Sequence, residues 1–188
     1  MADPMRCLKL ILAYDGTSFS GWQRQPQQHT VQGSLELAWK AITGESVRMA
    51  GSSRTDAGVH ALGQVASVRT KSQLEPAVLQ NGLNAKLGPE IVVLEVEEAP
   101  VHFHATGTLR TKRYRYQIHN SRQRTVFDRH YTWHVAQPLD VAAMHRAGQM
   151  LVGRHDFVCF QSVGSVREST VRTLFELLVV RGQGGGLD

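Results

Sequence analysis

Apolar side chains recur at every second position near the start of the chain. Over residues 6–14, one face carries four of them: Leu8, Leu10, Leu12 and Tyr14. Because successive side chains of a strand point to opposite faces, this alternation predicts a β-strand with one buried face. Short apolar runs bounded by turn residues predict further strands over residues 47–50, 64–69 and 91–96.

Two segments between these strands have helical spacing instead. Thr30 can cap a helix that ends at Thr43, with Gly44 just beyond it. The apolar face of this helix carries Val31, Leu35, Ala38 and Ile42. Pro76 suits the first turn of a second helix, which we expect to end near Lys86.

The later part of the chain repeats this mixture of patterns. Over residues 109–119, Tyr114, Tyr116 and Ile118 alternate with polar or basic residues, which predicts a strand with one apolar and one basic face. The other elements predicted here are, in chain order, a strand over 131–135, a helix that starts at 138–140 and a strand over 174–180.

These elements predict an α+β fold with two similar α+β halves. We expect the halves to join on one extended antiparallel sheet with helices on one face. The first half covers residues 1–105 and carries the loop of most chemical interest, and the second covers 106–188. A glycine-rich tail directly follows the last strand, so we expect the second half to be incomplete at its C-terminus.

Composition and charge narrow the class of protein. The 188 residues are 41% hydrophobic and 20% charged, as is typical of a globular protein. The sequence has no apolar stretch of transmembrane length, no secretion signal at its start and only two cysteines, so we expect a cytoplasmic protein without a membrane partner. The net charge of +5 favours a polyanionic partner.

The loop over residues 51–60 contains the strongest candidate for catalysis. Asp56 lies in a glycine-flanked segment, two residues after Arg54. A nearby guanidinium can stabilise an ionised carboxylate and still leave it accessible, as a nucleophile or base requires. Aspartate and threonine are also common in turns for conformational reasons, so this spacing alone leaves a purely structural role open for Thr55 and Asp56.

The longer string GSSRTDAGVHALGQV, at residues 51–65, closely resembles the signature of the tRNA pseudouridine synthase A family. The resemblance extends over nearly the whole chain in the order of the family's motifs. Its other segments are YDG at 14–16, FSGWQ at 19–23, FHA at 103–105, KRYRY at 112–116 and GRHDF at 153–157.

The resemblance implies a pseudouridine-synthase-like fold and an isomerase that converts uridine to pseudouridine in the anticodon arm of tRNA, at nucleotides 38 to 40. It implies no cofactor and no metal, and a homodimer is the family's usual state. Asp56 matches the family's catalytic aspartate. Its carboxylate could attack the uracil ring or C1′ of the sugar, and both routes require an extruded nucleotide.

Two further residues match or complement this site. We expect Arg54 to hold Asp56 in place and to stabilise the displaced nucleotide, with binding of a backbone phosphate as the alternative. Tyr114 matches the family's active-site tyrosine, whose ring can stack on the target base and whose hydroxyl lies where the C5 proton leaves. Tyr116 shares its strand face, and we expect it in the core rather than in the pocket.

Five other residues are candidates for RNA binding. Trp22, Gln23 and Arg24 combine a stacking surface, an amide and a fixed charge in one loop, with ordinary packing of Trp22 as the alternative. Arg113 and Arg115 point away from the tyrosines of their predicted strand. They would contact the RNA backbone or only solvate the sheet.

Two pairs of residues receive a structural interpretation. His102 and His104 have a spacing found at metal sites, but no third ligand is evident, so we predict no metal site. Asp156 and Phe157 are expected to mark a helix terminus and to anchor the core.

The sequence departs from the family pattern in two places. Thr106 and Gly107 stand where the family usually has an arginine and an aromatic residue, which removes one cationic contact. We also expect the family's C-terminal strand and supporting helix to be absent from this chain. The alternative hypothesis is therefore a catalytically inactive tRNA-binding or RNA-chaperone-like protein. The joint presence of Arg54, Asp56 and Tyr114 favours the active isomerase.

Overall fold

The computed structural model describes residues 5–108, 111–161 and 169–182. The chain divides between Tyr114 and Arg115 into two compact units, named here unit 1 and unit 2. The predicted mixture of helices with antiparallel strands is confirmed. Our boundary after Ala105 stays a prediction about how the chain is organised.

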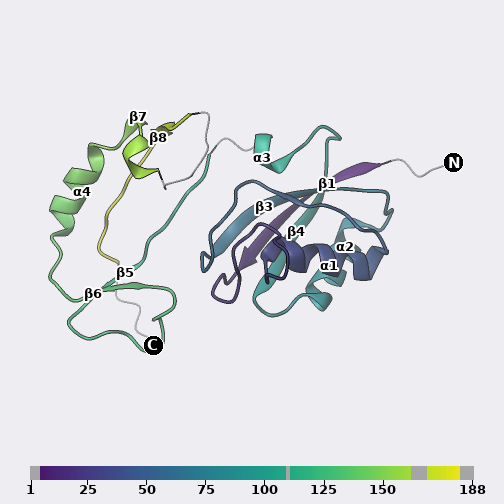
Figure 1. Cartoon of the computed structure of the whole chain (residues 1–188), viewed down its shortest axis with the longest axis horizontal. Coiled ribbons are helices and arrows are strands. Elements are labelled where there is room, and N and C mark those ends of the chain that lie inside the picture. The colour runs from purple at the N-terminus through teal and green to yellow at the C-terminus, as the bar shows by residue number, and fades with distance from the viewer. Residues whose placement is uncertain (1–4, 109–110, 162–168, 183–188) are drawn as a thin grey trace. The chain divides into compact units, whose positions relative to one another are not determined.

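Unit 1 is built on a four-stranded antiparallel sheet (Figure 1). Across the sheet the strands are β2 (Ala50–Gly51), β3 (Ala61–Thr70), β1 (Arg6–Tyr14) and β4 (Ile91–Ala99). β1 is a central strand, because Leu10 lies opposite Ala66 on β3 and opposite Val96 on β4. Its alternating apolar residues therefore belong to a face that continues onto both neighbouring strands.

Two helices, α1 (Val31–Thr43) and α2 (Pro76–Lys86), cover one face of this sheet (Figure 1) and have the predicted bounds. At the start of α1, the N–H of Gly33 donates to Oγ1 of Thr30 at 3.2 Å, and Gly44 ends the helix with a φ of +76°. The largest fully buried side chains of the core come from the sheet, the two helices and the segments that connect them: Trp22, Trp39, Leu8, Leu10, Leu12, Leu35, Met49, Leu79, Leu83, Val31, Val68 and Val93.

The strand predictions for unit 1 differ from the structure mainly in length. The strand over 6–14 is confirmed, and those predicted over 64–69 and 91–96 lie within longer strands. The strand predicted over 47–50 is wrong in extent, because only Ala50 and Gly51 pair with β3. The N–H of Met49 instead donates to the carboxylate of Glu36 at 3.0 Å.

A short helix, α3 (Ala105–Thr108), is attached to the β2–β3 edge of the sheet. The N–H of Ala105 donates to Oγ of Ser67 at 3.1 Å, and Oγ1 of Thr106 donates to the carbonyl oxygen of Gly51 at 2.8 Å. Thr106 therefore supports the strand that leads into the Asp56 loop.

Unit 2 contains shorter elements. β5 (Ile118–Asn120) pairs in parallel with β6 (Trp133–Val135), and β7 (Gly153–Asp156) pairs antiparallel with β8 (Val171–Leu174). Between the pairs lies α4 (Val141–Gln149), and the 3-10 helix η1 (Val158–Phe160) follows β7. Oδ1 of Asp140 accepts from the N–H of Ala143 at 2.9 Å and caps α4. The predicted helix start is thus confirmed.

The two longest strand predictions in the later part of the chain are wrong in extent. Among the described residues of the segment 109–119, only the last two form part of a strand, β5. The strand predicted over 174–180 shares only Leu174 with β8. Alternation produces a strand only where a neighbouring strand accepts its hydrogen bonds. Tyr116 is 85% exposed, so its predicted place in the core is wrong.

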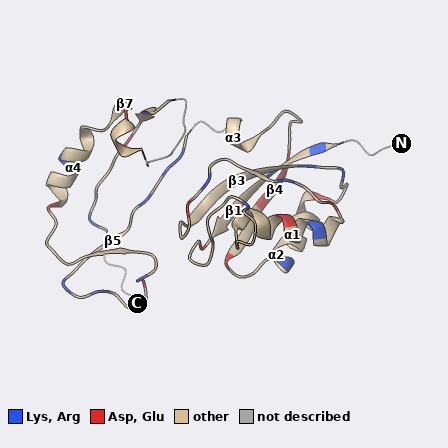
Figure 2. Ribbon diagram, in the orientation of Figure 1, with Lys and Arg blue, Asp and Glu red and all other residues tan. Residues whose placement is uncertain are grey.

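The described strands belong to three separate sheets, so the single extended sheet stays a prediction. None of the helices in the described ranges has the length and apolar character needed to cross a bilayer. Figure 2 shows Lys and Arg on both units, so the positive charge is not confined to one of them.

Candidate active site

The loop that carries Asp56 connects two paired strands. It follows β2 and precedes β3, and the N–H of Ser52 extends their pairing by donating to the carbonyl oxygen of Val65 at 2.8 Å. The side chains of Arg54 and Asp56 are exposed. The loop therefore presents a carboxylate and a guanidinium to solvent from a base that is fixed to the sheet.

The loop between β1 and α1 supports the Asp56 loop through backbone contacts. The N–H of Trp22 donates to the carbonyl oxygen of Thr55 at 3.0 Å. Gly21 lies at the closest approach, where its φ is +89° and an added Cβ would lie 2.6 Å from the carbonyl oxygen of Thr55. An added Cβ at Gly16 would lie 2.1 Å from the carbonyl oxygen of Val59. Only glycine permits the two loops to come this close.

A buried phenol contacts the Asp56 loop from β1. The hydroxyl of Tyr14 lies 2.9 Å from Oγ1 of Thr55, and the residue is 4% exposed. Burial raises the pKa of Tyr14 above its ordinary value, while hydrogen bonds with Thr55 and Gln64 act in the opposite direction. The phenol is therefore neutral near pH 7, and it holds Thr55 as a hydrogen-bonding group.

The far end of the loop is attached to the end of β1 through His60. The N–H of Gly16 donates to Nδ1 of His60 at 3.1 Å, and the same nitrogen lies 3.0 Å from Oδ1 of Asp15. The Asp56 loop is thus tied at Thr55 and at His60 to residues that follow or belong to β1.

Sequence reasoning gave no role to Gln64, although this residue contacts the start of the loop. Its Oε1 accepts from Oγ of Ser52 at 2.7 Å, and its Nε2 donates to the carbonyl oxygen of Ser53 at 2.8 Å. The pattern contained a signal, since Gln64 shares the face of β3 that Ala66 and Val68 bury. A buried polar side chain on such a face requires a partner.

The expected contact between Arg54 and Asp56 is not formed. Among the ion pairs of the described residues, none joins these two side chains. Both side chains are exposed, and an exposed ion pair is too weak to hold them together against solvation. The structure therefore shows no ion pair through which Arg54 would hold Asp56, and the role of Arg54 at the site stays a prediction.

Trp22 does not provide the stacking surface that we expected. Its side chain is 2% exposed, and its ring lies against Gly51, where an added Cβ would approach the indole to 2.5 Å. A ring enclosed in this way cannot stack on an RNA base. The alternative interpretation, packing of Trp22 under its own loop, is confirmed.

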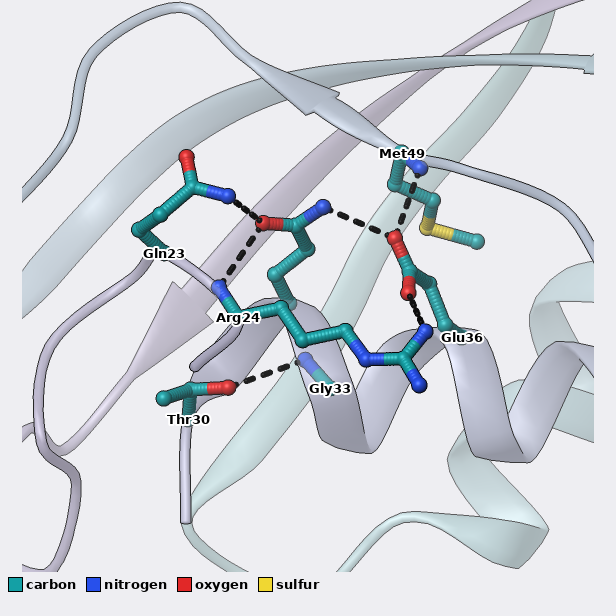
Figure 3. A network of polar contacts seen from close by, with 7 residues as sticks. Gln23, Arg24, Thr30, Gly33, Glu36 and Met49 are labelled. Atoms are coloured by element: carbon teal, nitrogen blue, oxygen red, sulfur yellow. Dashed lines mark hydrogen bonds and ion pairs between the residues drawn. The ribbon is translucent and has the colours of Figure 1, made fainter. Parts of the chain in front are cut away.

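Gln23 and Arg24 belong to a polar network on α1 (Figure 3). Oε1 of Gln32 accepts from Nε2 of Gln23 at 2.8 Å and from the N–H of Arg24 at 2.9 Å. The carboxylate of Glu36, which is 7% exposed, accepts from Nε2 of Gln32 at 2.8 Å and from the guanidinium of Arg24 at 3.0 Å. The network fixes the backbone of this loop while most of the Arg24 side chain stays exposed.

A groove of about 440 Å³ borders this network, and Arg24 and Arg48 are among the residues that line it. Both arginines are exposed. Two guanidinium groups on one groove can bind phosphate oxygens, whereas the buried Glu36 carboxylate is already satisfied by its donors.

Tyr114, the predicted active-site tyrosine, is the last residue of unit 1. Tyr114 lies in unit 1, in a segment without regular secondary structure, and is 70% exposed. None of the hydrogen bonds between described residues joins its hydroxyl to the Asp56 loop. Arg113 and Arg115 are exposed on either side of it, with Arg115 the first residue of unit 2.

Two observations concern the residues that received a structural interpretation. Within the described ranges, no group of three or more His, Cys, Asp or Glu side chains could hold an ion. Oδ1 of Asp156 accepts from the N–H of Val158, the first residue of η1, at 3.1 Å. Phe157 is only half-buried, so its predicted role as a core anchor is wrong.

Comparison with known proteins gives consistent matches across the chain. The sequence model of a family described as tRNA pseudouridine synthase matches residues 10–106. The tRNA pseudouridine synthase A of Acetivibrio thermocellus is 45% identical over 177 residues, which cover 94% of this chain and 72% of that protein. The protein of the same name from Brevibacillus brevis is 47% identical over 175 residues, covering 93% and 72% respectively. The family match includes the Asp56 loop and the residues found to support it.

Proposed function

Because the chain belongs to the tRNA pseudouridine synthase family, we propose that it converts uridine to pseudouridine at nucleotides 38 to 40 of tRNA, with Asp56 as the nucleophile. One observation carries the assignment of Asp56. Its side chain is exposed, while the loop just before it is tied to buried residues of the sheet, through the hydroxyl of Thr55 and the carbonyl oxygen of Ser53. A nucleophile needs this combination of access and fixed position.

The reaction needs only groups that the chain supplies. The N1–C1′ bond breaks, the uracil turns, a C5–C1′ bond forms, the proton on C5 leaves and N1 takes up a proton. The Asp56 carboxylate forms a transient bond either to C1′ or to the uracil ring and is released when the new glycosidic bond is complete. The product is an isomer of the substrate, so no oxidant, reductant or second substrate enters.

Tyr114 and Arg54 complete the proposed site. The exposed ring of Tyr114 stacks on the target base, and its hydroxyl assists departure of the C5 proton. The exposed guanidinium of Arg54 binds the displaced nucleotide. Gln23, Arg24, Arg113 and Arg115 contact the RNA around it. Trp22 is left out of this set because its ring is buried.

The larger organisation follows from the same family membership. We assign residues 1–105 and 106–188 to the two α+β halves of a pseudouridine-synthase-like architecture. The working form is a homodimer that meets its tRNA in the cytoplasm, and the reaction needs no cofactor.

The test is tritium release from C5-labelled uridine in an anticodon-arm tRNA transcript. We expect release by the unaltered chain and a loss of at least about a thousandfold in Asp56→Asn, with tRNA still bound. Glu75→Gln, which alters an exposed carboxylate without a side-chain hydrogen bond to its helix, is the matched control and keeps the full rate. Transcripts with uridine at only one of the three positions locate the target.

Two results would contradict parts of this assignment. Turnover retained in Asp56→Asn would remove the carboxylate from the mechanism. A chain that binds the transcript but releases no tritium would support the inactive tRNA-binding alternative instead.

A further inference from the structure

Gln64 places an amide on the buried face of β3, where a polar side chain requires hydrogen-bond partners. It lies opposite Leu12 of β1 and is 6% exposed. Burial of an amide that finds no hydrogen-bond partner destabilises the folded protein. Both ends of this amide are in fact satisfied, and both partners belong to the start of the Asp56 loop.

The hydrogen bonds fix the orientation of the Gln64 amide. The carbonyl oxygen of Ser53 can only accept, so the partner at 2.8 Å must be the NH₂ group. The hydroxyl of Ser52 then donates to Oε1 at 2.7 Å. One side chain on β3 thereby holds two successive loop residues, one through its side chain and one through its backbone.

Three residues of the loop before Asp56 are held by groups outside the loop. Ser52, Ser53 and Thr55 are held by Gln64, Tyr14 and the backbone of Trp22. The carboxylate of Asp56 itself has no hydrogen bond or ion pair among the described residues. Its position therefore depends on the loop backbone rather than on a partner of its own.

We propose that Gln64 is a positioning residue for the isomerisation, which holds the backbone at Ser52 and Ser53 so that Asp56 reaches the target nucleotide in the reactive geometry. This inference rests on the proposed function. The Gln64 amide touches neither substrate nor the reacting atoms, and it acts through the loop. Displacement of a reacting group by about 1 Å can lower a rate about a hundredfold.

The first test replaces the amide by an apolar side chain of similar length. Gln64→Met removes both hydrogen bonds, and we expect the single-turnover rate to fall about 10- to 100-fold while the Kd for tRNA changes less than about threefold. The matched control is Gln80→Met on α2. It removes an amide that donates to the carbonyl oxygen of Leu94 at 2.8 Å, away from the loop, and should keep the rate within about twofold.

A pH profile separates positioning from a general loss of stability. In Gln64→Glu, a protonated carboxyl can donate to Ser53 and accept from Ser52 as the amide does, whereas the ionised form cannot donate. We expect this variant to approach the unaltered rate at low pH and to lose it as the pH rises through the carboxyl pKa. A pH profile identical in shape to that of the unaltered chain would overturn the proposal.

Hydrogen exchange gives a readout that does not depend on turnover. We expect amide exchange in residues 52–60 to accelerate about tenfold in Gln64→Met and to stay unchanged in Gln80→Met. If the unaltered chain releases no tritium, the proposed function fails, and exchange still decides whether Gln64 holds the loop. Unchanged exchange, an unchanged rate in Gln64→Met, or an equal loss in Gln80→Met would each overturn the inference.

Discussion

Unit 1 and unit 2 differ in what their hydrophobic side chains contact. All the buried hydrophobic residues of the described chain lie in unit 1, from Cys7 to Ala105. In unit 2, Phe127, Trp133 and Phe160 are between 65% and 78% exposed. The two units have similar alternating and amphipathic patterns, so the pattern alone does not decide burial.

The difference arises from the number of neighbours that each strand has. β1 pairs on both sides, and two helices cover its apolar face. Each described strand of unit 2 pairs on one side only. A strand with one neighbour and no covering layer buries little apolar area, which is the main source of stability.

The largest expected difference in stability is between the replacement of Trp39 in unit 1 and the replacement of Trp133 in unit 2. Trp39 is fully buried, so Trp39→Ala should lower the free energy of unfolding by about 3–5 kcal/mol. Trp133 is 65% exposed, so Trp133→Ala should cost about 0.5 kcal/mol or less. Urea unfolding followed by circular dichroism measures both. Similar costs would show that Trp133 is buried in solution and would remove the contrast between the units.

A smaller difference is expected between two glycines with positive φ. Gly21→Ala should lower the free energy of unfolding by about 2–3 kcal/mol. The new Cβ would clash with the backbone of Thr55, and the positive φ would also be strained. Gly153→Ala in unit 2 should lower the free energy of unfolding by only about 1–2 kcal/mol, the effect of the positive φ alone. The nearest atom to its new Cβ belongs to the His155 side chain, at 3.4 Å. Thermal unfolding of the two variants distinguishes them, and equal shifts in Tm would argue against a tight contact between the loops of unit 1.

A still smaller difference in the free energy of unfolding is expected between the N-terminal caps of α1 and α4. Thr30 is 1% exposed and caps α1 within the core, so Thr30→Ala should cost about 1–2 kcal/mol. Asp140 caps α4 at an exposed site, and Asp140→Ala should cost about 0.5–1 kcal/mol. Chemical denaturation of both variants provides the measurement. A larger loss for Asp140→Ala would mean that unit 2 depends on its helix more than its exposure indicates.

The smallest effect should appear only at alkaline pH. Burial raises the pKa of Tyr14, so the folded chain binds the phenolic proton more tightly than the unfolded chain does. This contribution of Tyr14 to the free energy of unfolding is fully present below the ordinary tyrosine pKa of about 10. It is lost as the pH rises through the raised pKa that Tyr14 has in the folded chain. Tyr14→Phe should therefore weaken the decline of stability above about pH 10. Tyr116→Phe, at an exposed position, should leave the decline unchanged when urea midpoints are compared across this range.

The sequence predicted those elements whose boundaries depend on local chemistry. Thr30 and Gly44 define α1, and Pro76 defines the start of α2, because capping groups and a fixed φ act within one turn of a helix. The location of Arg54 and Asp56 in an exposed loop was also predictable, since turn residues separate two short apolar runs.

The tertiary structure decided everything that depends on a partner far away in the sequence. Trp22 is buried because the Asp56 loop and Gly51 enclose it, and Arg54 does not pair with Asp56 because both side chains remain in solvent. Gln64 holds the start of the loop from a strand that follows it. Spacing along a chain records which groups are present and in what order, whereas a hydrogen bond or a buried ring depends on which surfaces meet, and only the packed sheet determines that.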